Sequence, residues 1–302
     1  MAIAMESALR DPHLSAWAKL LRNAAVLFIL LFAIIPLLYL FGLASGLVTT
    51  RLQATSPPHD FGWYTIGRSA IFATVASSSQ ILIALAVVRT IPASLRRGTL
   101  IATKAGLILT AAPISIPPVA LGLLWRLLLE ADGPTAKFFE LVGLKLPPLL
   151  STKPVFGYDN TLNWSYISDL SVDTWMWMPL LVSLLLIACR RISDSIIDAA
   201  RIDCSSDNQI FWRIQLPLIT NWIAWLWLFR FIYLFRLHDT HWILFKNLIV
   251  IKLVSIDVYD LTIVTNHYRE GALVAVSTIV VSITVLFVIY FVQRTFLKQS
   301  ST

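Results

Sequence analysis

Long apolar runs alternate with shorter polar segments along most of the 302 residues. An apolar run of about 20 residues is long enough to cross the roughly 30 Å hydrocarbon core of a bilayer as an α-helix. The pattern therefore predicts an all-α integral membrane protein with six transmembrane helices. The predicted spans are residues 23–48, 69–88, 105–128, 174–189, 217–237 and 271–293.

The third predicted span carries three prolines, Pro113, Pro117 and Pro118. A proline inside a helix lacks a backbone N–H, and the resulting break is tolerated in a membrane where neighbouring helices or water satisfy the freed carbonyls. We therefore expect a kink or a break in this span. The polar segment 129–173 that follows is expected to lie outside the hydrocarbon.

Composition and charge agree with a membrane protein. Hydrophobic residues make up 57% of the chain and charged residues 14%, against roughly 25% charged residues in soluble domains. The net charge of +7 could suggest nucleic acid, but the distribution of bases across the bilayer matters more here. Segments 89–104 and 190–216 each carry four Arg or Lys residues. This clustering predicts that both segments and both termini, residues 1–22 and 294–302, are cytoplasmic.

Residues 198–217 form a polar island in the apolar sequence. One short helix fits up to Ile202. A second fits from Ser206, which has Gln209 at capping-box spacing, to Ile214. Cys204 to Ser206 would form the turn between them. An ordinary cytoplasmic loop with solvated charges is the alternative interpretation.

This island resembles the EAA motif of ABC-importer permeases: Glu-Ala-Ala, three residues, Gly, nine residues, then Ile-x-Leu-Pro. The spacing matches without a gap, with Asp in place of Glu and Cys in place of Gly. The matched positions are Asp198, Ala199, Ala200, Cys204, Ile214, Leu216 and Pro217.

The resemblance implies that loop 190–216 is a cytoplasmic coupling helix seated in a cleft of an ATPase subunit. Asp198 and Asp203 are then expected to make polar contacts with that subunit. Ala199, Ala200 and Ile202 would pack in its cleft, while Pro217 would turn the chain back into the membrane.

A softer resemblance covers residues 172–179, which are similar to the region before the fourth span of maltose-type and glycerol-phosphate-type permeases. Phe235 and Asp239 are similar to the Phe-Asp element of this family, although its later Gly-Gly-Pro is missing. The resemblance implies a carbohydrate importer of the bacterial inner membrane. Its implied partners are a second permease, two ATPases and an extracytoplasmic solute-binding protein. A permease for another polar solute, such as a polyamine, is the alternative.

Arg230 is the main candidate for a residue of the solute path, because it lies deep in the fifth predicted span. An arginine there costs about 2.5–3.5 kcal/mol on insertion scales and usually faces protein or water. Arg230, with Arg236 and Asp239, could line the path, and Trp175 and Trp177 are weaker candidates. The alternatives for Arg230 are an ion pair with an acid of a partner subunit, or snorkelling to the interface.

No cofactor is expected in this chain. The Gly-x-x-x-x-Gly-Lys-Ser/Thr phosphate loop is absent from the sequence, so ATP and Mg²⁺ would be bound by the partner ATPase. His238 and His241 raise a membrane metalloenzyme or haem protein as a rival class. Neither a Glu-x-x-His partner nor ligating cysteines accompany them.

Overall fold

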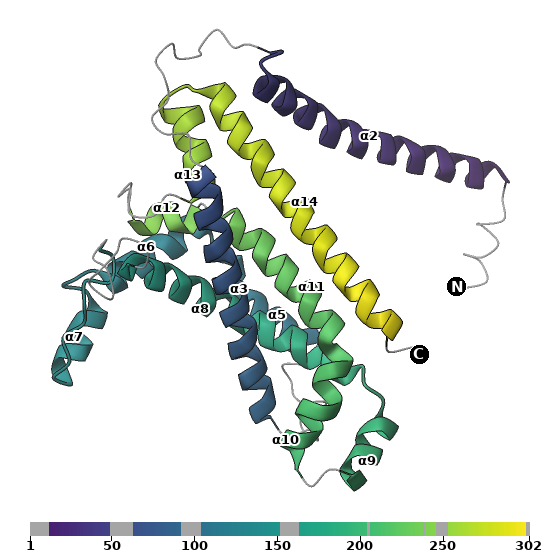
Figure 1. Cartoon of the computed structure of the whole chain (residues 1–302), viewed down its shortest axis with the longest axis vertical. Helices are drawn as coiled ribbons and strands as arrows, with labels where there is room; N and C mark the ends of the chain where they lie inside the picture. The colour runs from purple at the N-terminus through teal and green to yellow at the C-terminus, as the bar shows by residue number, and fades with distance from the viewer. Residues whose placement is uncertain are drawn as a thin grey trace. The chain divides into compact units, whose positions relative to one another are not determined.

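A computed structural model of the chain describes residues 12–48, 63–91, 104–151, 163–203, 206–237, 239–245 and 253–299 (Figure 1). These residues form helices and connecting turns, without a β-strand. The long helices are α2 (Pro12–Ser45), α3 (Trp63–Thr90), α8 (Trp164–Arg190), α11 (Leu216–Phe235) and α14 (Tyr268–Gln299). The shorter helices are α5 (Lys104–Ser115), α6 (Pro118–Leu129), α7 (Pro134–Leu141), α9 (Asp194–Asp203), α10 (Asp207–Ile210), α12 (Asp239–Phe245) and α13 (Val254–Tyr259). Two π-helical turns complete the described secondary structure, η2 (Phe211–Gln215) and η3 (Asp260–Val264).

The chain divides into two compact units. The first contains residues 1–61 and 258–276, and the second contains residues 62–257 and 277–302. In the first unit, the Val26–Ser45 part of α2 is apolar on all sides, and large side chains such as Phe28, Phe32 and Leu38 are exposed. A helix of this composition fits a lipid or protein environment and not water.

The second unit is built on α3, which packs against both α8 and α11, while α5 packs on α8 and α12 on α6 (Figure 1). The contact face of α3 carries small side chains, and Ala73, Ala76, Ser77 and Ala84 are fully buried. Small residues let helix backbones approach closely in membranes, where van der Waals contact supplies much of the association energy. The small residues of the second predicted span therefore form its packing face.

The predicted third span is not one helix. It is divided into α5 and α6, each of 12 residues, with a break at Ile116 and Pro117. Both break residues precede a proline and are disfavoured from the α conformation, and Pro117 has φ −54° and ψ 133°. Each half is about 18 Å long at 1.5 Å per residue, so neither half alone matches a hydrocarbon core.

The predicted start of the fourth span is also corrected. Its helix begins at Trp164 instead of residue 174, and Asp169 and Asp173 are buried within it. Acidic residues favoured the loop assignment, but both carboxylates have partners inside the bundle, described below. A paired acid can be accommodated in a buried helix, whereas an isolated one cannot.

Within the described residues, five helical segments are long and apolar enough to cross a membrane. They fall in α2, α3, α8, the segment from α10 to α11, and α14. They correspond to the first, second, fourth, fifth and sixth predicted spans. The count of six spans remains a prediction, because the broken third span does not meet the length criterion as a single helix.

The small-residue face of α3 generates a prediction about stability. Ala84 is fully buried and Ala86, two residues later, is exposed. We expect Ala84→Leu to lower the free energy of unfolding by about 1–3 kcal/mol through overpacking. Ala86→Leu adds the same side chain outside the core and should leave stability unchanged. Thermal unfolding of the two purified variants in detergent tests this, and equal midpoints would contradict the assigned packing face.

Candidate functional site

Helix α9 presents one face to the bundle and another to the outside. Ile197 and Ala200 are 4% exposed and belong to the main hydrophobic core. Ile196, at the edge of this buried face, is 43% exposed, and Ile202, on the opposite side of the helix, is 87% exposed. An acid lies in the first turn and Arg201 in the last, in the order that the helix dipole favours. The helix is therefore anchored by one face and carries apolar side chains on a free surface.

The predicted coupling residues of α9 do not all share that free surface. Asp198, Ala199 and Ile202 are exposed, and the Asp198 carboxylate lies 3.4 Å from the Arg201 guanidinium. Ala200 is buried in the core of its own chain, so the expectation that it fills a partner's cleft is corrected. Asp203 ends α9, but its side chain and Cys204 lie outside the described residues.

The second half of the loop begins as the sequence predicts. Ser206 caps α10, and its hydroxyl accepts a hydrogen bond from the backbone N–H of Gln209 at 3.4 Å. Ile210 and Phe211 then enter the core. The helix does not end at Ile214 but continues through η2 into α11.

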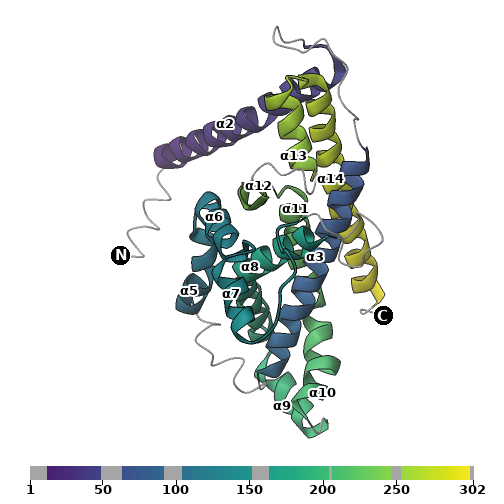
Figure 2. The same cartoon turned by 90° about the vertical axis from the view of Figure 1, so that its left-hand side faces the viewer.

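Pro217 lies in the first turn of α11 and does not turn the chain, which corrects its predicted role. The helix is continuous through this point, where Pro217 cannot donate an intrahelical hydrogen bond, and π turns are common places for a helix to accommodate such an interruption. The preceding π turn bridges the two helices, with Leu216 N–H donating to the carbonyl of Phe211. Ile214 and Leu216 are partly buried against the core. Helices α9 and α10 lie beyond the C-terminal end of α3 in both views (Figure 2).

A buried polar cluster joins α3, α8 and α11. The guanidinium of Arg230 forms an ion pair with Asp173, and its Nε donates to Gln80 Oε1 at 2.9 Å. Gln80 Nε2 in turn donates to Asp173 Oδ2 at 2.6 Å. The guanidinium also stacks 4.3 Å from the ring centre of Trp177 and 5.1 Å from that of Tyr233. All three hydrogen-bonding side chains are buried.

This cluster decides the interpretation of Arg230. Its side chain has no exposed area and its acidic partner belongs to the same chain. Two interpretations from the sequence are therefore wrong: Arg230 neither pairs with an acid of a partner subunit nor snorkels to the membrane interface. Its side chain also lines no exposed surface of this chain. Sequence reasoning missed Asp173 and Gln80, although an acid within an otherwise apolar helix is a signal for a buried cation nearby.

The other residues predicted for the solute path are dispersed. Trp177 is buried beside Arg230, while Trp175 on the same helix is 44% exposed and lies edge-on to Trp125. Arg236 caps the C-terminus of α11, and Asp239 is the first residue of α12. Both are exposed. The five candidates therefore do not converge on one site.

The histidine considered as a metal ligand has a carboxylate partner. His241 is buried, and its Nδ1 lies 2.7 Å from Asp169 Oδ2. His238 lies outside the described residues. Among those that are described, no group of three or more His, Cys, Asp or Glu residues is arranged to hold a metal ion.

Comparisons with known proteins identify the fold. The structure superposes on a chain from the crystal structure of a bacterial alginate ABC transporter in complex with an alginate-pentasaccharide-bound periplasmic protein. The TM-score is 0.68 at 18% identity, covering 96% of this chain and 97% of the other. A second structure, of a bacterial ABC transporter that imports the acidic polysaccharide alginate, gives the same score and identity over 97% and 98% of the two chains. The chain therefore has the fold of an ABC-importer permease.

A sequence comparison points the same way over a shorter stretch. An ABC transporter permease protein, ORF1, of Caldicellulosiruptor sp. strain Rt8B.4 is 34% identical over 58 residues. This stretch is 19% of the present chain and 41% of the relative's length. No family model matches the chain.

The polar cluster generates a prediction about paired substitutions. Arg230→Leu would leave the buried Asp173 carboxylate without its cation, and removing one partner of a buried pair costs about 3–5 kcal/mol. We expect a correspondingly lower unfolding midpoint in detergent. In the double variant Arg230→Leu/Asp173→Leu no charge remains unpaired, so much of the stability should return. A double variant less stable than either single variant would show that the ion pair does not couple the two positions.

Proposed function

We propose that this chain is the permease subunit of an ATP-driven importer and forms half of the translocation path for a carbohydrate. The observation that carries the proposal is the exposed side of α9, where Ile202 and Ala199 lie beside Asp198, within a segment that has EAA-motif spacing. The permease fold supports it independently. The chain itself hydrolyses no ATP, and Mg²⁺-ATP is bound by a separate ATPase subunit.

The proposed partners are two ATPase subunits, a second permease and an extracytoplasmic solute-binding protein. Both termini and the α9–α10 segment face the cytoplasm of a bacterial inner membrane, on the side marked by the clustered bases. Ile202, Ala199 and the carboxylates of Asp198 and Asp203 contact the ATPase. A polysaccharide or oligosaccharide is the favoured solute, because the structural neighbours belong to transporters described with alginate.

The packing of α9 supports a mechanism for coupling. Ile197 and Ala200 tie α9 to the same hydrophobic core that contains Leu185, Leu186 and Phe211. Closely packed cores transmit displacement because they deform little. A movement imposed on α9 when the ATPases close would therefore move the ends of α8 and α11, as required for rigid-body alternating access.

The exposed face of α9 gives a direct test of the ATPase contact. Ile202→Arg places a charge at the most exposed apolar position of α9, which does not contribute to the core, so the fold should be retained. We expect loss of the ATPase from the complex recovered by gentle extraction, measured by mass spectrometry. Ile202→Leu keeps an apolar side chain and is the matched control. Recovery of the ATPase with both variants would contradict the proposed contact.

Transport itself requires a second measurement. Membrane vesicles containing the assembled complex and its binding protein are expected to accumulate labelled alginate oligosaccharide when ATP is supplied on the cytoplasmic side. Unlabelled neutral oligosaccharides and a polyamine are then added as competitors. The degree to which each lowers uptake of the labelled alginate oligosaccharide ranks the solute classes. Uptake competed only by the polyamine would overturn the carbohydrate assignment. A complex without ATPase but with bound metal or haem would overturn the importer assignment.

A further inference from the structure

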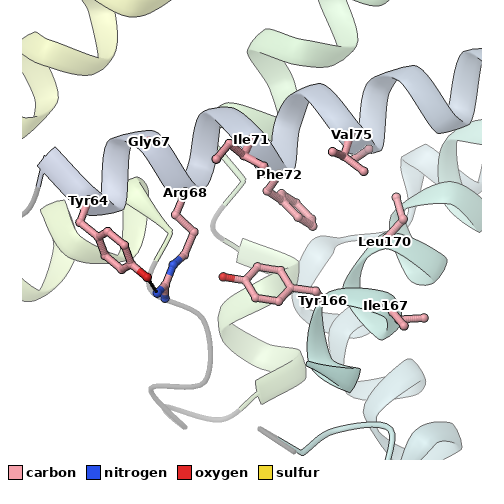
Figure 3. Close-up of a pocket in the computed structure, with 10 residues that line it drawn as sticks. Tyr64, Gly67, Arg68, Ile71, Phe72, Val75, Tyr166, Ile167 and Leu170 are labelled. Atoms are coloured by element: carbon pink, nitrogen blue, oxygen red, sulfur yellow. Dashed lines mark hydrogen bonds between the residues drawn. The ribbon is translucent and has the colours of Figure 1, made fainter. Parts of the chain in front are cut away.

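A groove lies between α3 and α8 within the second unit, and it has a volume of about 400 Å³ (Figure 3). Its walls are aliphatic and aromatic along most of its length. Ile71, Phe72 and Val75 contribute from α3, and Ile167 and Leu170 from α8. Gly67 lies on the same face of α3, and a Cβ built there would meet no atom within 4 Å. The groove is therefore open beside Gly67.

The polar groups of the groove gather at one end. Arg68 donates from Nη2 to the hydroxyl of Tyr64 at 2.7 Å, and its guanidinium lies 4.4 Å from the centre of the Tyr64 ring. These contacts hold a cation at the mouth of an apolar channel. Arg68 is partly exposed, and no carboxylate is paired with it among the ion pairs of the described residues.

Tyr166 adds a second donor to that end. Its side chain lines the groove and is 7% exposed, and its hydroxyl points toward the side of Arg68 (Figure 3). That hydroxyl makes no hydrogen bond of ordinary geometry within the described part of the chain, although it is close enough to the Arg68 guanidinium to interact with it. A buried hydroxyl without a well-formed hydrogen bond is destabilising. An oxygen atom of a ligand at this end would satisfy it.

The length of the groove matches one leaflet of a bilayer. From Tyr64 to Val75 α3 rises about 16 Å at 1.5 Å per residue, which is about half of a 30 Å hydrocarbon core. The polar end of the groove lies near the start of α3. Arg68 is five residues after Trp63, the first residue of that helix.

We propose that this groove is a binding site for a phospholipid with an anionic headgroup. A phosphate oxygen accepts hydrogen bonds from Arg68 and Tyr166, and an acyl chain lies along Ile71, Val75 and Leu170. The headgroup belongs to the leaflet away from the base-rich segment that follows α3. An oligosaccharide fits poorly because the walls offer almost no polar partners, and a protein helix would leave the polar end without an anion. The proposal does not depend on the transported solute or on the ATPase.

Two substitutions separate the headgroup contact from the acyl contact. Arg68→Gln removes the cation, and one basic residue contributes about 1 kcal/mol toward anionic lipid, or about fivefold in affinity. Gly67→Phe projects a ring into the open groove. A Cβ at this position meets no atom of the chain within 4 Å, so the substitution should not disturb the fold. The matched control is Leu82→Phe, an exposed position on α3 that does not line the groove.

The experiment uses the full-length protein in detergent and titrates it with phosphatidylglycerol or phosphatidylcholine of identical acyl chains, with bound lipid counted by native mass spectrometry. The wild type is expected to bind phosphatidylglycerol about fivefold more tightly than phosphatidylcholine. Arg68→Gln should lose that preference while still binding both lipids, and Gly67→Phe should lose one tightly bound lipid of either kind. Leu82→Phe should behave as the wild type.

Three results would overturn the proposal. One is equal affinity of the wild type for the two lipids, and another is an unchanged lipid count in Gly67→Phe. The third is capture of a partner subunit in place of lipid by a photoreactive residue at Ile71, which would show that protein covers the groove. Thermal unfolding of each variant shows that the protein counted is folded.

Discussion

The buried ion pair between Arg230 and Asp173, bridged by Gln80, is the interaction on which the bundle depends. Removing charged groups from water is costly, and the mutual attraction offsets this cost only when the remaining donors and acceptors also find partners. The packed helices bring all three side chains together, while Asp173 Oδ1 and Arg230 Nη1 have no hydrogen-bond partner within the described residues. The ion pair fixes the register of α3, α8 and α11 relative to one another, because a shift of one helix would leave a buried charge unpaired.

The two proposed surfaces both follow from this register. At one end of the bundle, the core continues from α8 through Ile197 and Ala200 into α9, which leaves Ile202 facing outward. On the side of the bundle, the same pair of helices, α3 and α8, separates enough to form the groove beside Gly67. A rigid core with an exposed contact helix suits a subunit that receives mechanical work from a partner. A lipid held between its helices would fill a space that the side chains leave open.

The residues predicted for the solute path do not form one site in this chain. They separate into a buried structural pair, Arg230 and Trp177, and exposed positions such as Trp175 and Asp239. In the proposed importer the path would lie partly between two permeases, so its lining need not converge within one of them. Arg230 acts here through the helices that it holds, which is why its position deep in an apolar segment is tolerated.

The sequence by itself determined the features that depend on local chemistry. Hydrophobic run lengths located the five long helices, and the three prolines of the third span predicted a kink or a break within it. The spacing of Ser206 and Gln209 predicted the cap of α10. Only the tertiary structure showed that Asp169 and Asp173 belong inside α8 and that Ala200 is buried while Ile202 is exposed. It also showed that the helix starting at Asp207 runs on through Pro217 without a turn. The partners of Arg230 lie 57 and 150 residues away along the chain. Such contacts leave no periodic or local signal, because they exist only once the helices have packed.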